Sequence, residues 1–155
     1  MRQTNVVLKN TIYSEVNIGD TAEFSKVLSE EDIDLFSKVS GDMNPVHLDE
    51  AFASKTIFKG KIAHGLWSAS LISATLGTVY PGPGTIYLGQ TLSFIRPVRI
   101  NDTLSVTLCV TEKNDNNNSI TLSCIVINQK GEKVLTGEAN VIAPTEKVSY
   151  TSTLN

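Results

Sequence analysis

The segment Gly41–His47 contains the two side chains of this chain that are best suited to proton transfer. The carboxylate of Asp42 can accept a proton or orient a water molecule, and the imidazole of His47 can carry a proton near neutral pH. Gly41 permits unusual backbone dihedrals before Asp42, and Pro45 stiffens the approach to His47. We therefore expect a constrained loop that brings both side chains to one water molecule.

The same segment is also an ordinary turn sequence. Asp42 and Asn44 are residue types that hydrogen-bond to their own backbone in turns, and Gly and Pro are common beside them. From the residue types alone, a structural turn is the stronger interpretation and catalysis is the alternative. Loops held in place by rigid neighbours nevertheless often carry functional residues.

Other kinds of catalytic site have less support in the sequence. His47 and His64 are its two histidines, and no group of His, Cys and carboxylates has the spacing of a metal site. The Gly-rich nucleotide-binding motifs and the Gly-x-Ser-x-Gly nucleophile motif do not occur. We therefore expect no metal and no cofactor, and acid–base chemistry is the main catalytic option. His64 directly precedes an expected helix, where a structural, hydrogen-bonded role is the simpler interpretation.

Helices are expected on both sides of the Gly41–His47 segment. Ser29 is a favourable N-cap, the acidic residues 30–32 complement the helix dipole, and Gly41 suits the C-terminal end. The apolar stripe of this first helix consists of Ile33, Phe36 and Val39. A short helix is expected at 48–53, and a largely buried helix follows from about Gly65 to Leu76, ended by Gly77.

Strand-like segments account for most of the remaining chain. Leu104, Val106, Leu108 and Val110 alternate with polar or small residues, which is the period of a half-buried strand. Further extended segments are expected at 10–16, 21–28, 86–95, 120–127 and 134–142. The order of elements predicts one α+β domain over residues 1–155, with a sheet packed on the buried helix. Residues 1–10 are expected to form a loosely attached arm, and the polar tail after Pro144 is expected to be frayed.

Composition restricts the classes of partner. The net charge of −3 and the pI of about 5.3 give no general attraction to nucleic acid, so we expect no nucleic-acid partner. The N-terminus lacks the apolar region of a secretory signal, and no stretch is long and apolar enough to span a membrane. Cys109 and Cys124 match neither a zinc motif nor a redox pair, and are expected to be small buried residues. Cytoplasmic localisation and no membrane partner are therefore expected.

A longer motif surrounds the acid–base pair. Residues 36–47, Phe-Ser-Lys-Val-Ser-Gly-Asp-Met-Asn-Pro-Val-His, followed by Ala53, resemble the signature of MaoC-like, (R)-specific enoyl-CoA hydratases (hydratase 2). The similarity continues through residues 63–66, 87–94 and 137–139 and spans about residues 20–143. The resemblance implies a hot-dog fold, in which a curved antiparallel sheet wraps a long central helix.

The resemblance also implies roles for individual residues. Asp42 and His47 match the catalytic pair of the family, and Asn44 lies in the same active loop. Gly65 matches the residue whose backbone N–H contacts the thioester carbonyl, and Ser73 matches a serine beside the site. The implied partners are an acyl-CoA substrate, with acyl-carrier protein as a possible second carrier, and another copy of the chain in a homodimer or a dimer of dimers.

The implied activity is the (R)-specific hydration of trans-2-enoyl-CoA and the reverse dehydration, in fatty-acid or polyhydroxyalkanoate-type metabolism. The alternatives are a 3-hydroxyacyl-ACP dehydratase, a hot-dog thioesterase and a non-catalytic acyl-CoA-binding domain, because the fold alone does not choose among them. The intact order Asp-x-Asn-Pro-x-His from Asp42 to His47 favours a hydratase.

Overall fold

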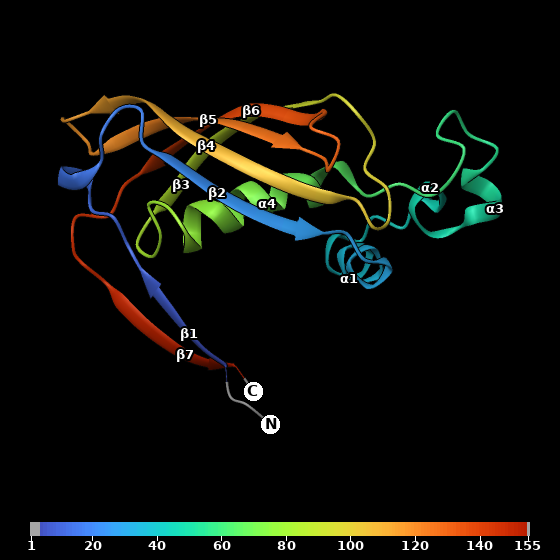
Figure 1. The fold of residues 1–155 in the computed structure, drawn as a ribbon, viewed down its shortest axis with the longest axis horizontal. Coiled ribbons are helices and arrows are strands. Elements are labelled where there is room, and N and C mark those ends of the chain that lie inside the picture. Colours follow the sequence, from blue (N-terminus) through green and yellow to red (C-terminus); the bar gives the residue numbers. More distant parts are fainter. Residues whose placement is uncertain (1–3, 155) are drawn as a thin grey trace.

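The computed structural model describes residues 4–154, in which an antiparallel sheet curves around one helix. The sheet has the strand order β2-β4-β5-β6-β3. Its strands are β2 (Thr21–Val27), β3 (Ile86–Phe94), β4 (Thr103–Asn114), β5 (Ser119–Ile127) and β6 (Lys133–Ile142). Figure 1 shows helix α4 (Gly65–Thr78) lying along the concave face of this sheet. The α+β fold with a helix wrapped by a curved sheet, implied by the resemblance, is therefore confirmed.

Alternating burial on the strands forms the core beneath the sheet. In β4 the apolar residues of the alternating pattern are almost completely buried, and the residues between them are half-exposed. Helix α4 buries one side against the sheet, through Trp67, Ser68, Leu71, Ile72, Thr75 and Leu76. Burying a large apolar side chain stabilises a fold by about 1.5–3 kcal/mol, so this layer fixes the position of α4 relative to the strands.

Helix α1 (Glu30–Ser40) begins and ends as the sequence predicts. The Oγ of Ser29 accepts a hydrogen bond from the backbone N–H of Asp32 at 3.1 Å, and the Asp32 carboxylate accepts one from the backbone N–H of Ser29 at 2.9 Å. Gly41 caps the other end in the left-handed region, with φ of 79°. The expected stripe is only partly correct, since Val39 is exposed and Ser37 is buried instead.

Two expectations for the connecting segments were wrong. The stretch 10–16, expected to be extended, contains the 3-10 turn η1 (Tyr13–Glu15). The predicted loop through His47 ends at Asn44, because helix α2 (Pro45–Leu48) begins there and is followed by α3 (Glu50–Ala53). Proline is favourable at the first position of a helix, where its missing N–H has no intrahelical acceptor to satisfy.

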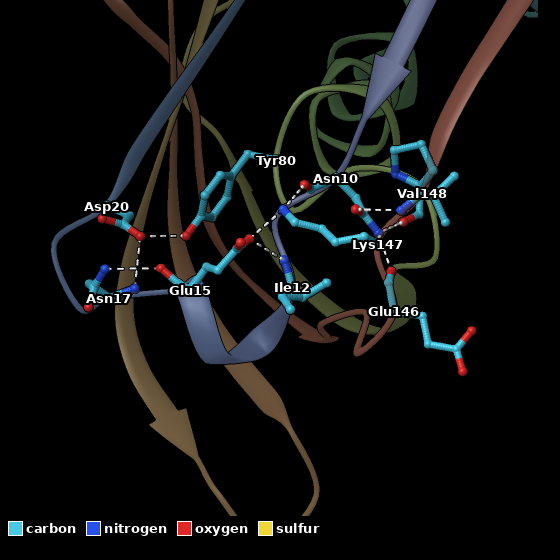
Figure 2. Close-up of polar contacts among 10 residues, drawn as sticks. Asn10, Ile12, Glu15, Asn17, Asp20, Tyr80, Glu146, Lys147 and Val148 are labelled. Atoms are coloured by element: carbon cyan, nitrogen blue, oxygen red, sulfur yellow. Dashed lines mark hydrogen bonds and ion pairs between the residues drawn. The ribbon is translucent and has the colours of Figure 1, made fainter.

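The terminal segments form a ribbon instead of a frayed tail. Strand β1 (Thr4–Lys9) pairs antiparallel with β7 (Ser149–Leu154), and Figure 1 shows this ribbon projecting away from the sheet and α4. At its base the buried side chain of Asn10 donates to the carbonyls of Pro83 and Glu146 and accepts from the N–H of Val148 (Figure 2). Asn10 therefore ties the ribbon to the turn before β3.

Nothing in the described residues 4–154 forms a helix long and apolar enough to cross a membrane.

Candidate active site

Helix α2 places His47 in the interior. The Oδ1 of Asn44 accepts a hydrogen bond from the N–H of Val46 at 3.1 Å, which caps the helix, and Pro45 occupies its first position. His47 lies in the single turn that follows and is 7% exposed. The family resemblance implied that Asn44 is a residue of the active loop, and in the structure Asn44 caps the helical turn that carries His47.

The ring of His47 is held by one backbone group. Its Nδ1 lies 2.8 Å from the carbonyl oxygen of Ile62, and a carbonyl can only accept, so Nδ1 carries the proton. In the neutral ring Nε2 is then the bare nitrogen, and it lies 3.9 Å from Oδ2 of Asp42. Burial lowers the pKa of His47 below its ordinary value of 6.5, and nearby His64 acts in the same direction, although the Ile62 carbonyl and Asp42 oppose the shift. This ring is therefore suited to accept a proton at neutral pH.

Asp42 lies at the end of α1, with its side chain 51% exposed. Its Oδ1 accepts a hydrogen bond from the N–H of Asn44 at 3.1 Å, and its own N–H donates to the Oγ of Ser40 at 3.2 Å. These short-range bonds are the turn chemistry that the sequence indicated. They leave Oδ2 facing His47, so the turn interpretation and the catalytic interpretation are compatible.

The second histidine completes the cluster. The His64 ring stacks on that of His47, with centroids 3.8 Å apart and an interplanar angle of 28°. Ligand atoms of Asp42, His47 and His64 lie within 4.8 Å of one another. Each ring already has one nitrogen bonded to a backbone carbonyl, which leaves one nitrogen of each ring for another partner.

Gly65 is the first residue of α4 and directly follows this cluster. Its backbone N–H lies at a helix N-terminus, where intrahelical acceptors are absent and the helix dipole is positive. A Cβ added to Gly65 would lie 2.9 Å from Cε1 of Phe94, closer than side-chain carbons pack. Glycine is thus the residue that allows the Phe94 ring to approach the start of the helix.

A cavity of about 320 Å³ connects His47 with Gly65. It falls within the range of small-molecule sites, which are mostly apolar and contain a few polar groups. Its remaining lining is largely apolar and comes from the segment before α4, from α4 itself, from the end of β3 and the β3–β4 connection, and from β6: Phe58, Ile62, Ala63, Ser68, Phe94, Ile95, Arg96, Pro97, Val98 and Val134. A ligand in this cavity would contact both the imidazole and the N-terminus of α4.

A known family accounts for this combination of sheet, helix and site. The MaoC like domain family matches the chain over residues 14–130. The chain belongs to the MaoC-like family. The resemblance noted in the motif from Phe36 to His47 is thereby confirmed.

Curated MaoC-like relatives share much of the sequence. The chain is 44% identical to an (R)-specific enoyl-CoA hydratase of Rhodospirillum rubrum over 134 residues, which cover 85% of this chain and 91% of that one. It is 42% identical to a 3-hydroxybutyryl-CoA dehydratase of Methylorubrum extorquens over 137 residues, covering 88% and 87% of the two chains.

Solved MaoC-like structures share the fold. The R-hydratase PhaJ1 from Pseudomonas aeruginosa superimposes with a TM-score of 0.92 at 49% identity, covering 97% of this chain and 96% of that chain. The (R)-hydratase from A. caviae involved in PHA biosynthesis gives a TM-score of 0.81 at 40% identity, covering 83% and 98%. The hot-dog architecture is therefore shown by structure as well as by sequence.

The structure brings together some of the predicted site residues of this MaoC-like chain and not others. Asp42 and His47 face one another, and His47 and Gly65 line the same cavity. Ser73 lies on the exposed side of α4, outside the cavity lining, and its role beside the site stays a prediction.

Several residues that shape the site were missed by the sequence analysis. The carbonyl of Ile62 orients His47, and Phe94 covers Gly65. A backbone carbonyl has no signature in a sequence, and Phe94 is one of several apolar residues in its strand. Their roles depend on contacts between segments that are far apart along the chain.

Proposed function

We propose that this chain is an (R)-specific enoyl-CoA hydratase, which adds water to trans-2-enoyl-CoA to give (R)-3-hydroxyacyl-CoA and catalyses the reverse dehydration. The observation that carries the proposal is the 3.9 Å separation of His47 Nε2 and Asp42 Oδ2 beside a cavity that also contains Gly65. Two atoms at this distance are too far apart for a direct hydrogen bond and close enough to bind one water together. The names of the relatives support the same reaction.

The first step uses the acid–base pair. Asp42 accepts a hydrogen bond from the water, and the bare Nε2 of His47 takes a proton as the water oxygen forms a bond to C3 of the enoyl thioester. The electrons of the double bond move toward C2 and the carbonyl oxygen, and the proton is then delivered to C2. The product has gained one OH and one H, and the enzyme returns to its starting state. Positioned proton transfer of this kind typically contributes about 10²–10⁴-fold to the rate.

The second element of the mechanism is the N–H of Gly65. Negative charge develops on the thioester oxygen as the C3–O bond forms. A preorganised backbone donor stabilises such a charge by about 3 kcal/mol when judged from the loss of comparable donors. The exposed guanidinium of Arg96, which lines the same cavity, offers a positive charge to the phosphates of a CoA carrier.

The proposal includes a homodimer. Strand β3 is at the edge of the sheet and exposes Ile86, Tyr87, Leu88 and Phe94. An apolar edge strand is a template for pairing with another chain, and exposed apolar patches commonly mark interfaces.

The proposed compartment is the cytoplasm, because Cys109 and Cys124 are both free thiols. The proposed pathway is fatty-acid or polyhydroxyalkanoate-type metabolism.

An assay with two readouts tests the activity. Purified protein is mixed with trans-2-enoyl-CoA substrates of increasing chain length, while the absorbance of the conjugated enoyl thioester and the release of free thiol are followed together. Hydration removes the absorbance without releasing thiol. Thiol release would instead identify a thioesterase, and tight binding without turnover at any chain length would identify a non-catalytic domain.

A further inference from the structure

His64 contacts several parts of the site, although the proposed reaction assigns it no step. It is 2% exposed and precedes Gly65 as the N-cap residue of α4. Its Nε2 lies 3.0 Å from the carbonyl oxygen of Asp42 and 3.2 Å from Oγ of Ser37 in α1. One face of the ring stacks on His47, and the Phe36 ring lies 5.0 Å away. One side chain thus joins α1, the Asp42 turn, α2 and the start of α4.

The hydrogen bonds define which nitrogen carries the proton. A carbonyl oxygen can only accept, so the nitrogen next to Asp42 O is the protonated one, and Nε2–H donates. Nδ1 is then a bare nitrogen, and it is buried without a hydrogen-bond partner among the described residues. His47 has the opposite arrangement, with its proton on Nδ1 toward Ile62. The two stacked rings therefore hold their protons toward two different backbone carbonyls.

Asp42 depends on this contact for its position. Its other hydrogen bonds are to Ser40 and Asn44, both within two residues of it, and these bonds move with the turn. The bond from His64 is the connection to a distant and buried part of the chain. Without it, the carboxylate could drift away from His47, and a displacement of about 1 Å at a reacting centre can reduce a rate by about 10²-fold.

We propose that His64 is a positioning residue of the hydration reaction, which holds the Asp42 turn through Nε2–H and holds the His47 ring by stacking, so that both groups reach one water. The inference rests on the proposed hydratase function. His64 does not contact the reacting atoms in this scheme; it sets the distance between the two groups that do.

Three substitutions separate the two contacts. Glutamine places an amide N–H near the position of Nε2 and removes the ring, phenylalanine keeps a ring and removes the donor, and asparagine is too short to supply either. We expect His64→Asn to lower kcat about 10–100-fold while KM changes less than about threefold. His64→Gln should recover more of the wild-type kcat than His64→Phe, because the donor to Asp42 is restored.

Ser37→Ala is the matched control. It removes the other neighbour of the same ring nitrogen and leaves the bond to Asp42 in place. We expect it to change kcat less than about threefold. An equal loss of kcat in Ser37→Ala and His64→Asn, or normal kcat in His64→Asn, would overturn the positioning role. Absence of enoyl-CoA hydration by the wild-type protein would instead defeat the proposed function itself.

A measurement on the unmodified protein keeps the inference testable if the variants do not fold. Nitrogen-15 NMR distinguishes the two neutral tautomers of a histidine ring. We expect the proton on Nε2 of His64 and on Nδ1 of His47. A His64 ring protonated on Nδ1 alone could not donate to the Asp42 carbonyl and would contradict the inference.

Discussion

At the scale of single residues, the site depends on which atoms the backbone leaves available. The Nδ1–H of His47 donates a hydrogen bond to the carbonyl of Ile62, and Nε2 then faces the Asp42 carboxylate. Gly65 contributes only a backbone N–H, and its lack of a side chain is what allows Phe94 to approach. In the proposed mechanism, Asp42, His47 and Gly65 supply proton transfer and charge stabilisation.

The lowered pKa of His47 determines the pH dependence. Because burial keeps the folded ring neutral below its ordinary pKa of 6.5, the acid limb of the kcat/KM profile should lie below pH 6.5. The unfolded chain takes up this proton at a higher pH than the folded chain does. The free energy of unfolding should therefore fall as the pH decreases below about 6.5. An acid limb above pH 6.5, measured across a pH series, would contradict this assignment.

Gly65→Ala should affect catalysis more than stability. The added Cβ would lie 2.9 Å from Cε1 and 3.1 Å from Cδ1 of Phe94, so the half-exposed ring must move within the cavity. We expect kcat/KM to fall at least about 10-fold, a loss of the size that small displacements at a reacting centre produce. Alanine is favoured over glycine in a helix by about 0.5–1 kcal/mol, which offsets part of the strain in the folded state.

Gly77→Ala in the same helix is the control, since nothing lies within 4 Å of its added Cβ. It should raise the free energy of unfolding by about 0.5–1 kcal/mol and leave kcat/KM unchanged. Activity is measured together with stability to chemical denaturation. Equal activity of the two variants would show that Gly65 has no role in catalysis.

At the scale of secondary-structure elements, the sequence predicted the helix ends and the buried strand face that depend on local hydrogen bonds and on residue alternation. Ser29 and Gly41 define α1 through their own capping bonds, and the alternation in β4 defines its buried face. The prediction failed at Pro45, which was expected to stiffen a loop and instead occupies the first position of helix α2. It failed again at residues 10–16, which bond through their backbone to Pro81 and Pro144, and at residues 149–154, which pair with β1.

The side chain of Asn10 is expected to anchor the base of the β1–β7 ribbon. Asn10→Ala removes two donated bonds, of 3.0 and 2.8 Å, and one accepted bond of 2.9 Å at the base of the ribbon. Losing partly buried hydrogen bonds of this kind costs about 0.5–1.5 kcal/mol each. Hydrogen exchange of the β1 and β7 amides should accelerate, while enoyl-CoA turnover stays within about twofold of wild type. The exposed Asn5→Ala in β1 is the control and should leave exchange unchanged; similar exchange in both variants would show that Asn10 is not the anchor.

At the scale of the whole molecule, the fold explains how separate segments meet at one site. The curved sheet holds α4 with its N-terminus beside the α1–α2 connection, and the β3–β4 connection closes the cavity from the other side. The order of the elements predicted an α+β fold with a sheet packed on a buried helix, and the resemblance to MaoC-like hydratases implied that the sheet is curved. The tautomers, the Phe94 contact and the exposure of Ser73 could not be predicted, because they depend on distances between elements.

The two superpositions differ in how much of this chain they cover. The superposition on PhaJ1 covers 97% of this chain, whereas that on the A. caviae hydratase covers 83%. We propose that residues 1–10 and 145–155, of which 1–3 and 155 lie outside the described residues, are peripheral to one catalytic domain that the rest of the chain forms. This agrees with the position of the ribbon away from the sheet (Figure 1).

The most direct test concerns the water molecule that we propose Asp42 and His47 bind together. The initial rate of enoyl-CoA hydration should be compared for wild type, Asp42→Asn and His47→Ala, each shown to be folded by its thermal unfolding transition. We expect both substitutions to lower kcat by about 10²–10⁴-fold, because each removes one of the two groups that hold and deprotonate the water. Near-normal kcat in both folded variants would show that the reaction does not depend on this pair.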